Sequence, residues 1–198
     1  MPEFLQQLDE TWIFWVQEHL HNAFTDVIFP FFTYLGEVGA IWIAVGIILL
    51  FSKKYRWWGG LLLFTLLTSY IAGDLILKNI VCRPRPCQDF PQVPLLIAAP
   101  SSFSFPSGHS LSGMACACIL CRFHKKLGIP AVVLALLIAF SRVFLFVHYP
   151  IDVLTGLVLG ILWAWFIWKG VQFTPLRHHY HEERLTSPLS DRYFKKGI

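Results

Sequence analysis

The sequence contains little charge. Asp, Glu, Lys and Arg together make up 14% of its 198 residues, whereas soluble domains average about 25%. Hydrophobic residues reach 56% and the mean hydropathy is +0.57, against a usual apolar share of about 45–50%. This composition excludes an ordinary soluble domain and makes the membrane the first solvent to consider. We expect a bilayer, and no nucleic acid, as the surroundings of the chain.

The start of the chain has no leader pattern. Residues 1–10 are polar and mildly acidic, whereas a signal peptide opens with a basic region and a short apolar core. We therefore expect no removed signal peptide. The sequence also shows no internal repeat and no low-complexity tract. These features favour one membrane-embedded domain over residues 1–172, followed by a polar cytoplasmic tail over residues 173–198.

The five cysteines do not form a disulfide framework. Cys116, Cys118 and Cys121 lie in one apolar segment, where a thiol behaves as a small hydrophobic group. Cys82 and Cys87 bracket an Arg-Pro-Arg-Pro run, and their pairing stays open because it requires an oxidising space. No spacing of Cys and His indicates a zinc site.

Long apolar runs predict an all-α polytopic membrane protein. A membrane-spanning helix needs about 20 residues, and six candidate runs predict a six-transmembrane-helix bundle. They cover residues 23–35, 41–51, 57–80, 108–123, 128–147 and 151–171. Ahead of them, apolar and aromatic residues recur at helical spacing, which predicts an N-terminal amphipathic helix at the membrane interface. These are Leu5, Leu8, Trp12, Trp15, Val16 and His19.

Lysine and arginine residues divide between two predicted faces. Twelve fall on one side of the six-helix arrangement, which the positive-inside tendency assigns to the cytoplasm. They are Lys53, Lys54, Arg56, Arg122, Lys125, Lys126, Lys169, Arg177, Arg184, Arg192, Lys195 and Lys196. The other four, Lys78, Arg83, Arg85 and Arg142, fall at or near the opposite face and need another explanation.

Charge close to the hydrocarbon is costly and usually functional. A single arginine such as Arg83 could extend its head to the interface. Four cations at one face, together with two histidines and an aspartate, instead suit a phosphate or diphosphate. Arginine makes bidentate contacts with phosphate oxygens, and lysine supplies a point charge.

A Pro-Ser-Gly-His segment opens the fourth predicted helix. A helix N-terminus presents unpaired N–H groups and the positive end of the helix dipole, which favour an anion. Gly108 lets the backbone approach an anion closely. Ser107 can cap the helix and donate its hydroxyl to a phosphate oxygen.

His109 and His148 are the reactive groups of this face. Histidine can act as nucleophile, acid or base near neutral pH. Asp152 follows His148 by four residues, across Pro150 in the first turn of the last predicted helix. We expect Asp152 to accept a hydrogen bond from one ring nitrogen of His148, which would fix the tautomer and direct the other nitrogen outward.

Three motifs at these positions resemble the signatures of the type 2 phosphatidic acid phosphatase superfamily. They are Lys, six residues and Arg-Pro from Lys78 to Pro86; Pro-Ser-Gly-His over residues 106–109; and Ser-Arg, five residues, His, three residues and Asp from Ser141 to Asp152. All three occur in order, and no motif position departs from the pattern. The resemblance covers residues 71–171, whereas the first seventy residues fit by hydropathy only.

The resemblance implies a role for each motif residue. His148 would attack phosphorus in line and form a phosphohistidine, and Asp152 would orient it and stabilise its charge. His109 would protonate the leaving oxygen and then activate the hydrolytic water. The phosphoryl oxygens would be held by Lys78, Arg85, Ser107, Gly108 and Arg142.

The motifs leave three nearby residues without an assigned role. Arg83, Tyr149 and Asp89 lie outside the motif positions and could add accessory contacts. The family needs no metal or cofactor, and the site offers few carboxylates to hold a metal ion. A binding or transport protein that kept only the phosphate site is disfavoured, because binding alone does not require His109, His148 and Asp152.

Among members of the superfamily, this short form is similar to bacterial undecaprenyl diphosphate phosphatases and phosphatidylglycerophosphate phosphatases. A site on the outer face of a bacterial plasma membrane favours conversion of undecaprenyl diphosphate to undecaprenyl phosphate, because that carrier lipid exposes its diphosphate there. Phosphatidylglycerophosphate and phosphatidic acid stay as alternatives. A lipid phosphotransferase that uses the same phosphohistidine also stays open.

Overall fold

The computed structural model describes residues 2–173, which are helical and contain no strand, so the predicted all-α class is confirmed. The elements are α1 (Glu3–His19), α2 (Thr25–Gly36), the 3₁₀ turn η1 (Glu37–Gly39), α3 (Ala40–Phe51), α4 (Arg56–Tyr70), the π-helical segment η2 (Ile71–Leu77), α5 (Lys78–Val81), α6 (Pro86–Asp89), α7 (Gly108–Phe123), α8 (Lys125–Phe144) and α9 (Pro150–Gln172). Apart from its first residue, the predicted tail over residues 173–198 lies outside the described residues.

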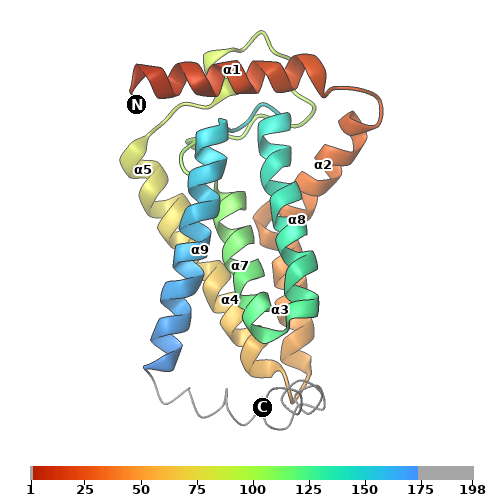
Figure 1. The fold of residues 1–198 in the computed structure, drawn as a ribbon, viewed down its shortest axis with the longest axis vertical. Coiled ribbons are helices and arrows are strands. Elements are labelled where there is room, and N and C mark those ends of the chain that lie inside the picture. Colours follow the sequence, from red (N-terminus) through yellow and green to blue (C-terminus); the bar gives the residue numbers. More distant parts are fainter. Residues whose placement is uncertain (1, 174–198) are drawn as a thin grey trace, which may run out of the picture.

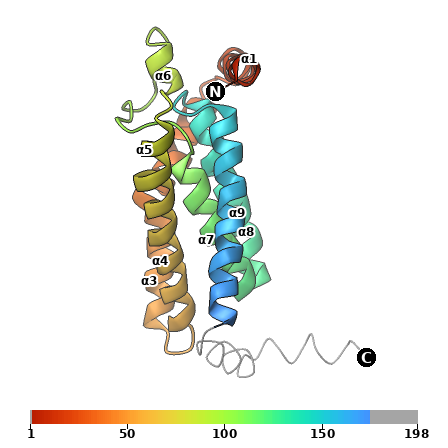
Figure 2. The same cartoon turned by 90° about the vertical axis from the view of Figure 1, so that its left-hand side faces the viewer.

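Helix α7 lies inside the bundle, as Figure 1 and Figure 2 show. It packs mainly against α8 and α9, and also against α4. Gly156 and Gly160 of α9 approach it so closely that a Cβ at either position would meet the backbone of α7 or of its N-cap. Small residues four apart permit such close approach between helices in a membrane bundle. This packing fixes the N-terminus of α7 next to the start of α9.

Four segments within residues 2–173 are helical, long and apolar enough to cross a membrane: Thr25–Phe51, Arg56–Asp89, Lys125–Phe144 and Pro150–Gln172. The predicted count of six spans is not confirmed, for two reasons. The first two predicted spans are joined, because α2, η1 and α3 follow one another as one bent segment (Figure 1). Helix α7 has 16 residues, fewer than the roughly 20 that a full crossing needs.

The structure differs from the prediction in three further segments. The helix predicted over residues 128–147 ends at Phe144, so residues 145–149 form a loop before α9. The segment that joins the third and fourth predicted helices contains the short helix α6. The helix predicted over residues 57–80 is interrupted by η2, and π-helical turns occur frequently at functional sites.

Helix α1 lies across one end of the bundle (Figure 1), so the predicted N-terminal helix is present. Its inner face carries Ile13 and Val16, which pack against the loop at residues 145–149. Its outer face exposes the large apolar side chains of Phe4, Leu8, Trp12 and Trp15. Val16, which the predicted stripe also contains, is buried on the inner face. The position of α1 at a membrane surface stays a prediction.

The two ends of the bundle differ in charge. The turns from α3 to α4 and from α7 to α8, and the end of α9, lie at the end opposite α1 (Figure 1). They carry Lys53, Lys54, Arg56, Arg122, Lys125, Lys126 and Lys169. The end that carries α1 also contains the residues that the sequence assigned to phosphate chemistry.

Candidate active site

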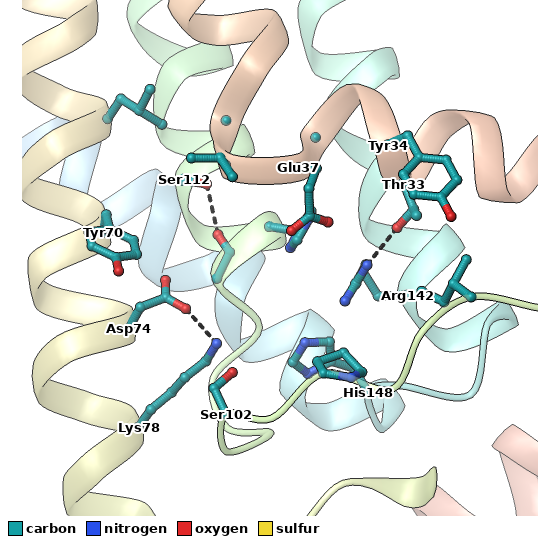
Figure 3. Close-up of a pocket in the computed structure, with 18 of the residues that line it drawn as sticks. Thr33, Tyr34, Glu37, Tyr70, Asp74, Lys78, Ser102, Ser112, Arg142 and His148 are labelled. Atoms are coloured by element: carbon teal, nitrogen blue, oxygen red, sulfur yellow. Dashed lines mark hydrogen bonds and ion pairs between the residues drawn. The ribbon is translucent and has the colours of Figure 1, made fainter. Parts of the chain in front are cut away.

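A cavity of about 780 Å³ brings together most of the predicted site residues. Its polar part is lined by Lys78, Arg85, Gly108, His109, Arg142 and His148. Its apolar part is lined by side chains of α3 and α4, namely Ile43, Leu63, Leu66 and Leu67. Figure 3 shows Lys78, Arg142 and His148 approaching the cavity from separate elements. A cavity with cations in one part and apolar walls in another fits a molecule with an anionic head and an apolar chain.

His148 is enclosed by protein, with 1% of its surface exposed. Its Nε2 lies 3.1 Å from Nη1 of Arg85, and its Nδ1 lies 3.3 Å from Oγ of Ser104. Because a guanidinium can only donate hydrogen bonds, Nε2 is the acceptor and Nδ1 carries the ring proton. Burial, helped by Arg85 and Arg142, holds the pKa of the His148 imidazole well below its ordinary value. The ring is therefore neutral, with a lone pair on Nε2.

Asp152 supports His148 through a serine. Oδ2 of Asp152 lies 3.7 Å from Nδ1 of His148, which is too long for a hydrogen bond, so the predicted direct hydrogen bond is not formed. Ser104 donates its hydroxyl proton to Oδ2 of Asp152, which also accepts the backbone N–H of Tyr149 at 3.0 Å. Sequence reasoning missed Ser104, because this residue lies in a loop and outside all three motifs.

The loop that presents His148 has an unusual backbone. Phe146 has a φ of 59°, which is uncommon for a residue with a bulky side chain. Packing maintains this conformation, because the Phe146 ring contacts Phe14 of α1 and Phe90 near α6. Strained backbone of this kind often occurs beside functional groups.

Arg85 makes hydrogen bonds to the backbone and side chains around His148. Its five N–H groups point to protein acceptors: the backbone oxygens of Ser102, Phe103 and Val147, the hydroxyl of Ser102, and Nε2 of His148. Arg85 nevertheless lines the cavity. Its predicted contact with phosphate therefore requires an exchange of at least one of these partners.

Arg83 is 7% exposed and pairs with two carboxylates. Nη1 donates to Oδ1 of Asp152, and Nη2 donates to Oδ2 of Asp9 at 2.7 Å. Its guanidinium lies over the ring of Tyr149, 4.1 Å from the centroid, and the Tyr149 hydroxyl donates to Asp89. Arg83 therefore does not extend its head to the membrane interface. Asp9 could not be assigned from the sequence, because 74 positions separate it from Arg83.

His109 faces the cavity from the first turn of α7. Its Nε2 is buried, has no hydrogen-bond partner among the described residues, and lies 3.6 Å from Oε2 of Glu37. The bend at η1 brings Glu37 there, since Val38 has a φ of 52° and turns the chain. Gly36 allows this approach, because a Cβ at that position would meet the His109 ring and Ile138. Sequence reasoning did not find Glu37, since only this bend carries it to the site.

Lys78 and Asp74 form an ion pair in the cavity wall, as Figure 3 shows. They lie four residues apart across the junction of η2 and α5. The Asp74 carboxylate also lies against Gly108, where any side chain would collide with it. The close approach that the sequence predicted for a phosphate at Gly108 is thus made in this structure by a protein carboxylate.

Arg142 and Ser107 have different surroundings. Arg142 lines the cavity and donates from Nη1 to Oγ1 of Thr33 at 2.7 Å (Figure 3). Ser107 is fully buried, and its Oγ accepts the N–H of Ser110 at 3.4 Å and the Ser110 hydroxyl at 2.9 Å. The predicted cap of α7 is confirmed. The contact of Ser107 with phosphate stays a prediction, because its side chain is not part of the cavity wall.

None of the five cysteines lines this cavity. All five cysteines are free, so Cys82 and Cys87 do not pair. The sequence also contains a His-His-Tyr-His run at residues 178–181, which lies outside the described residues. Over residues 2–173, no group of three or more His, Cys, Asp or Glu side chains is placed to hold a metal ion.

The fold and the cavity first define a class: a helical membrane protein with a site suited to phosphate. The family model of the PAP2 superfamily then matches residues 58–175, which is more than half of the chain. The chain belongs to this superfamily. Helices α1, α2 and α3 precede the matched region.

Relatives and a solved structure agree with this assignment. The chain is 31% identical over 133 residues to an undecaprenyl-diphosphatase of Sulfolobus acidocaldarius, covering 67% of this chain and 63% of that protein. It is 37% identical over 139 residues to phosphatidylglycerophosphatase B of Bacillus subtilis, covering 65% and 64% respectively. The match thus spans just under two thirds of each relative. The crystal structure of a PAP2-type phosphatidylglycerolphosphate phosphatase from Bacillus subtilis is similar with a TM-score of 0.72 at 29% identity, covering 88% of this chain and 90% of that one.

Proposed function

We propose that the protein is a membrane lipid phosphatase that hydrolyses a lipid phosphate monoester or diphosphate through a phosphohistidine on His148. The observation that carries this proposal is the cavity. Lys78, Arg85 and Arg142 line it together with a buried, neutral His148, and its other walls are apolar. The cations suit a phosphate, the imidazole lone pair suits a nucleophile, and the apolar walls suit a lipid chain.

In the first step, Nε2 of His148 attacks phosphorus, and the bond from phosphorus to the leaving oxygen breaks. The lone pair is available because Nδ1 carries the ring proton. The new N–P bond makes the imidazole cationic, and the Asp152 carboxylate stabilises this charge through Ser104. Arg85, which touches Nε2 in the resting site, would turn toward the phosphoryl oxygens as they arrive.

His109 acts on the other side of the reaction. It donates a proton to the leaving oxygen as the first bond breaks. The neutral ring then takes a proton from the water that attacks the phosphohistidine, which releases phosphate and restores His148. The first step requires the protonated ring, which burial beside Arg142 disfavours and the nearby Glu37 carboxylate favours.

The phosphoryl oxygens are held by cations and by the N-terminus of α7. Lys78, Arg85 and Arg142 balance the charge of the phosphate, and Gly108 and Ser107 contribute at the helix N-terminus. Contact of phosphate with Lys78 and Gly108 requires the Asp74 carboxylate, which now occupies both positions, to give way. Because these groups already supply positive charge, the proposed reaction needs no metal ion.

The proposed topology places this cavity outside the cytoplasm. Thr25–Phe51, Arg56–Asp89, α7, α8 and α9 run in alternating directions between the two ends of the bundle (Figure 1). The basic turns at one end favour a cytoplasmic location for that end, which includes the end of α9. Helix α1 and the cavity would then lie on the outer side of a bacterial plasma membrane, with the aromatic face of α1 toward lipid.

The proposed substrate is undecaprenyl diphosphate, which would be converted to undecaprenyl phosphate. An outward cavity supports this choice, and so does the similarity to an undecaprenyl-diphosphatase. Phosphatidylglycerophosphate is the second candidate, because phosphatidylglycerophosphatase B and the solved phosphatidylglycerolphosphate phosphatase are also similar. Phosphatidic acid and transfer of the phosphoryl group to an acceptor alcohol remain to be separated by experiment.

A substrate panel tests the proposal. The purified protein in detergent is given undecaprenyl diphosphate, phosphatidylglycerophosphate, phosphatidic acid and a lipid A phosphate, with and without an acceptor alcohol. We expect inorganic phosphate from the lipids, with the highest kcat/KM for undecaprenyl diphosphate. Phosphate that appears only on the acceptor would instead indicate a phosphotransferase, and no release from any lipid would contradict the proposal.

Removal of metal ions tests the chemistry of the same reaction. We expect EDTA to leave the rate unchanged, because the charge of the phosphate is balanced by Lys78, Arg85 and Arg142. The measurement is phosphate release before and after chelation, with magnesium added back. Strong inhibition that magnesium reverses would contradict a metal-free mechanism.

A further inference from the structure

Helix α1 holds the nucleophile region through one buried aspartate. Asp9 lies on the inner face of α1 and is 1% exposed. Its Oδ2 accepts a hydrogen bond from Nη2 of Arg83 at 2.7 Å, and its Oδ1 accepts the backbone N–H of Ile151 at 2.8 Å. Burial raises the pKa of this carboxyl, whereas the Ile151 N–H and Arg83 oppose that shift. Two donors on two oxygens favour the carboxylate form.

Arg83 passes this contact on to Asp152. Its second nitrogen, Nη1, donates to Oδ1 of Asp152, so one buried guanidinium joins Asp9 and Asp152. The planar group is also fixed by the Tyr149 ring below it and by Oε1 of Gln6 at 2.7 Å. Ile151, the second contact of Asp9, is the residue next to Asp152 in the chain. Asp9 therefore fixes both the cation and the backbone that position Asp152.

The charges of these three groups determine how Asp152 acts on His148. Arg83 and Asp152 alone would form a neutral pair, which would stabilise an imidazolium weakly. With Asp9 the group carries one net negative charge, and interactions between charges are strong where water is excluded. The negative charge is needed when the proposed N–P bond makes His148 cationic.

We infer that Asp9 is a positioning residue for phosphoryl transfer, acting through Arg83 on Asp152 and hence on His148. This inference rests on the proposed function. It extends the active site to α1, which lies outside the region matched by the family model, residues 58–175. The site is thus completed by the chain's own N-terminal helix.

The test compares Asp9→Asn with Glu18→Gln, which removes the same charge from an exposed position of α1. Full-length variants are purified in detergent, their melting temperatures are measured, and kcat and KM for a lipid phosphate are determined per folded protein. We expect Asp9→Asn to lower kcat by about tenfold or more, which is less than the roughly 10,000-fold loss when the direct orienting partner of a catalytic histidine is replaced. KM should stay within about twofold of the wild type, because no phosphate contact is removed.

A double-mutant cycle shows whether Asp9 acts through Arg83. In an Arg83→Gln background, Asp9→Asn should lower kcat by less than about a further twofold, because coupled residues are not additive. If Asp9→Asn cannot be purified folded, Arg83→Lys gives the same comparison, since one amine cannot replace the two guanidinium nitrogens that hold the two carboxylates. It should also lower kcat with little change in KM.

Three results would overturn the inference. They are a kcat for Asp9→Asn equal to that of Glu18→Gln, a loss explained entirely by unfolded protein, and losses for Asp9→Asn and Arg83→Gln that multiply independently. The proposed function is tested separately by the wild type. Absence of phosphate release by the wild type and Glu18→Gln alike would overturn that function and this inference together.

Discussion

His148 and His109 face the same cavity with different surroundings. Both ring nitrogens of His148 have neighbours, Arg85 and Ser104, and only 1% of the residue is exposed. Nε2 of His109 has no hydrogen-bond partner among the described residues, and the nearby Glu37 side chain is 57% exposed. Both ring nitrogens of His148 thus have a neighbouring polar group, whereas Nε2 of His109 makes no hydrogen bond within the described residues.

This difference matches the two parts of the proposed reaction. A nucleophile must be neutral and aimed at phosphorus, so a rigid shell of Arg85, Ser104 and Asp152 is useful around it. A proton donor must exchange protons with the leaving group and with water, so a nitrogen without a fixed protein partner is useful there. The following changes test that contrast, beginning with the largest expected effect.

Replacement of His148 should have the largest effect on the rate. We expect His148→Ala to lower phosphate release by at least about 1,000-fold, as removal of a nucleophile does in other enzymes. Phosphate release from lipid phosphate is measured on protein whose melting curve shows that it is folded. A folded variant with a rate near that of the wild type would show that His148 is not the nucleophile.

Replacement of His109 should lower the rate less and should change which step limits it. We expect His109→Gln to lower steady-state turnover by about 100- to 1,000-fold, which is the lower part of the usual contribution of a general acid and base. With a substrate whose leaving group needs no proton, the first step should survive, so rapid-quench measurements should show a burst followed by slow hydrolysis. Equal loss of burst and steady state for such a substrate would mean that His109 has another role.

Removal of the serine between His148 and Asp152 should have an intermediate effect. We expect Ser104→Ala to lower kcat by about 10- to 100-fold, because a hydrogen bond to a charged group contributes about 1.5–3 kcal/mol. The matched control is Ser52→Ala, at the turn from α3 to α4 far from the cavity. If both serine variants keep the kcat of the wild type, Asp152 does not act through Ser104.

Loss of the exposed carboxylate near His109 should have the smallest effect. We expect Glu37→Gln to lower kcat by about fivefold or less, since an exposed ion pair contributes about 1 kcal/mol or less. The effect should be seen with lipid substrates and should disappear with a leaving group that needs no proton. A loss as large as that of Ser104→Ala would remove the distinction between the two histidines.

The sequence predicted most of the residues that line the cavity, but not the residues that hold them in place. Lys78, Arg85, His109, Arg142 and His148 occur in motifs at helix ends, and all of them line one cavity in the structure. Apolar runs likewise located α3, α4, α7 and α9. Both kinds of signal are local, because they depend on residues close together in the chain.

The supporting contacts depend on the folded chain and had no local signal. Asp9 and Arg83 lie 74 residues apart, and Ser104 and Asp152 lie 48 apart. Glu37 reaches His109 through the positive φ of Val38, which hydropathy does not reveal. The same bend joins the first two predicted spans into one, and together with the short α7 it leaves four candidate spans within residues 2–173 where six were predicted.

The measurement that tests the central claim most directly is the location of the phosphoryl group on the enzyme. His109→Gln is mixed with a lipid phosphate that has a good leaving group, quenched at the end of the burst under alkaline conditions that preserve phosphohistidine, digested, and sequenced by mass spectrometry. The account predicts one phosphorylated peptide, modified at His148, and none when His148→Ala is added. A burst with the phosphoryl group on another residue, or full turnover by His148→Ala, would contradict it.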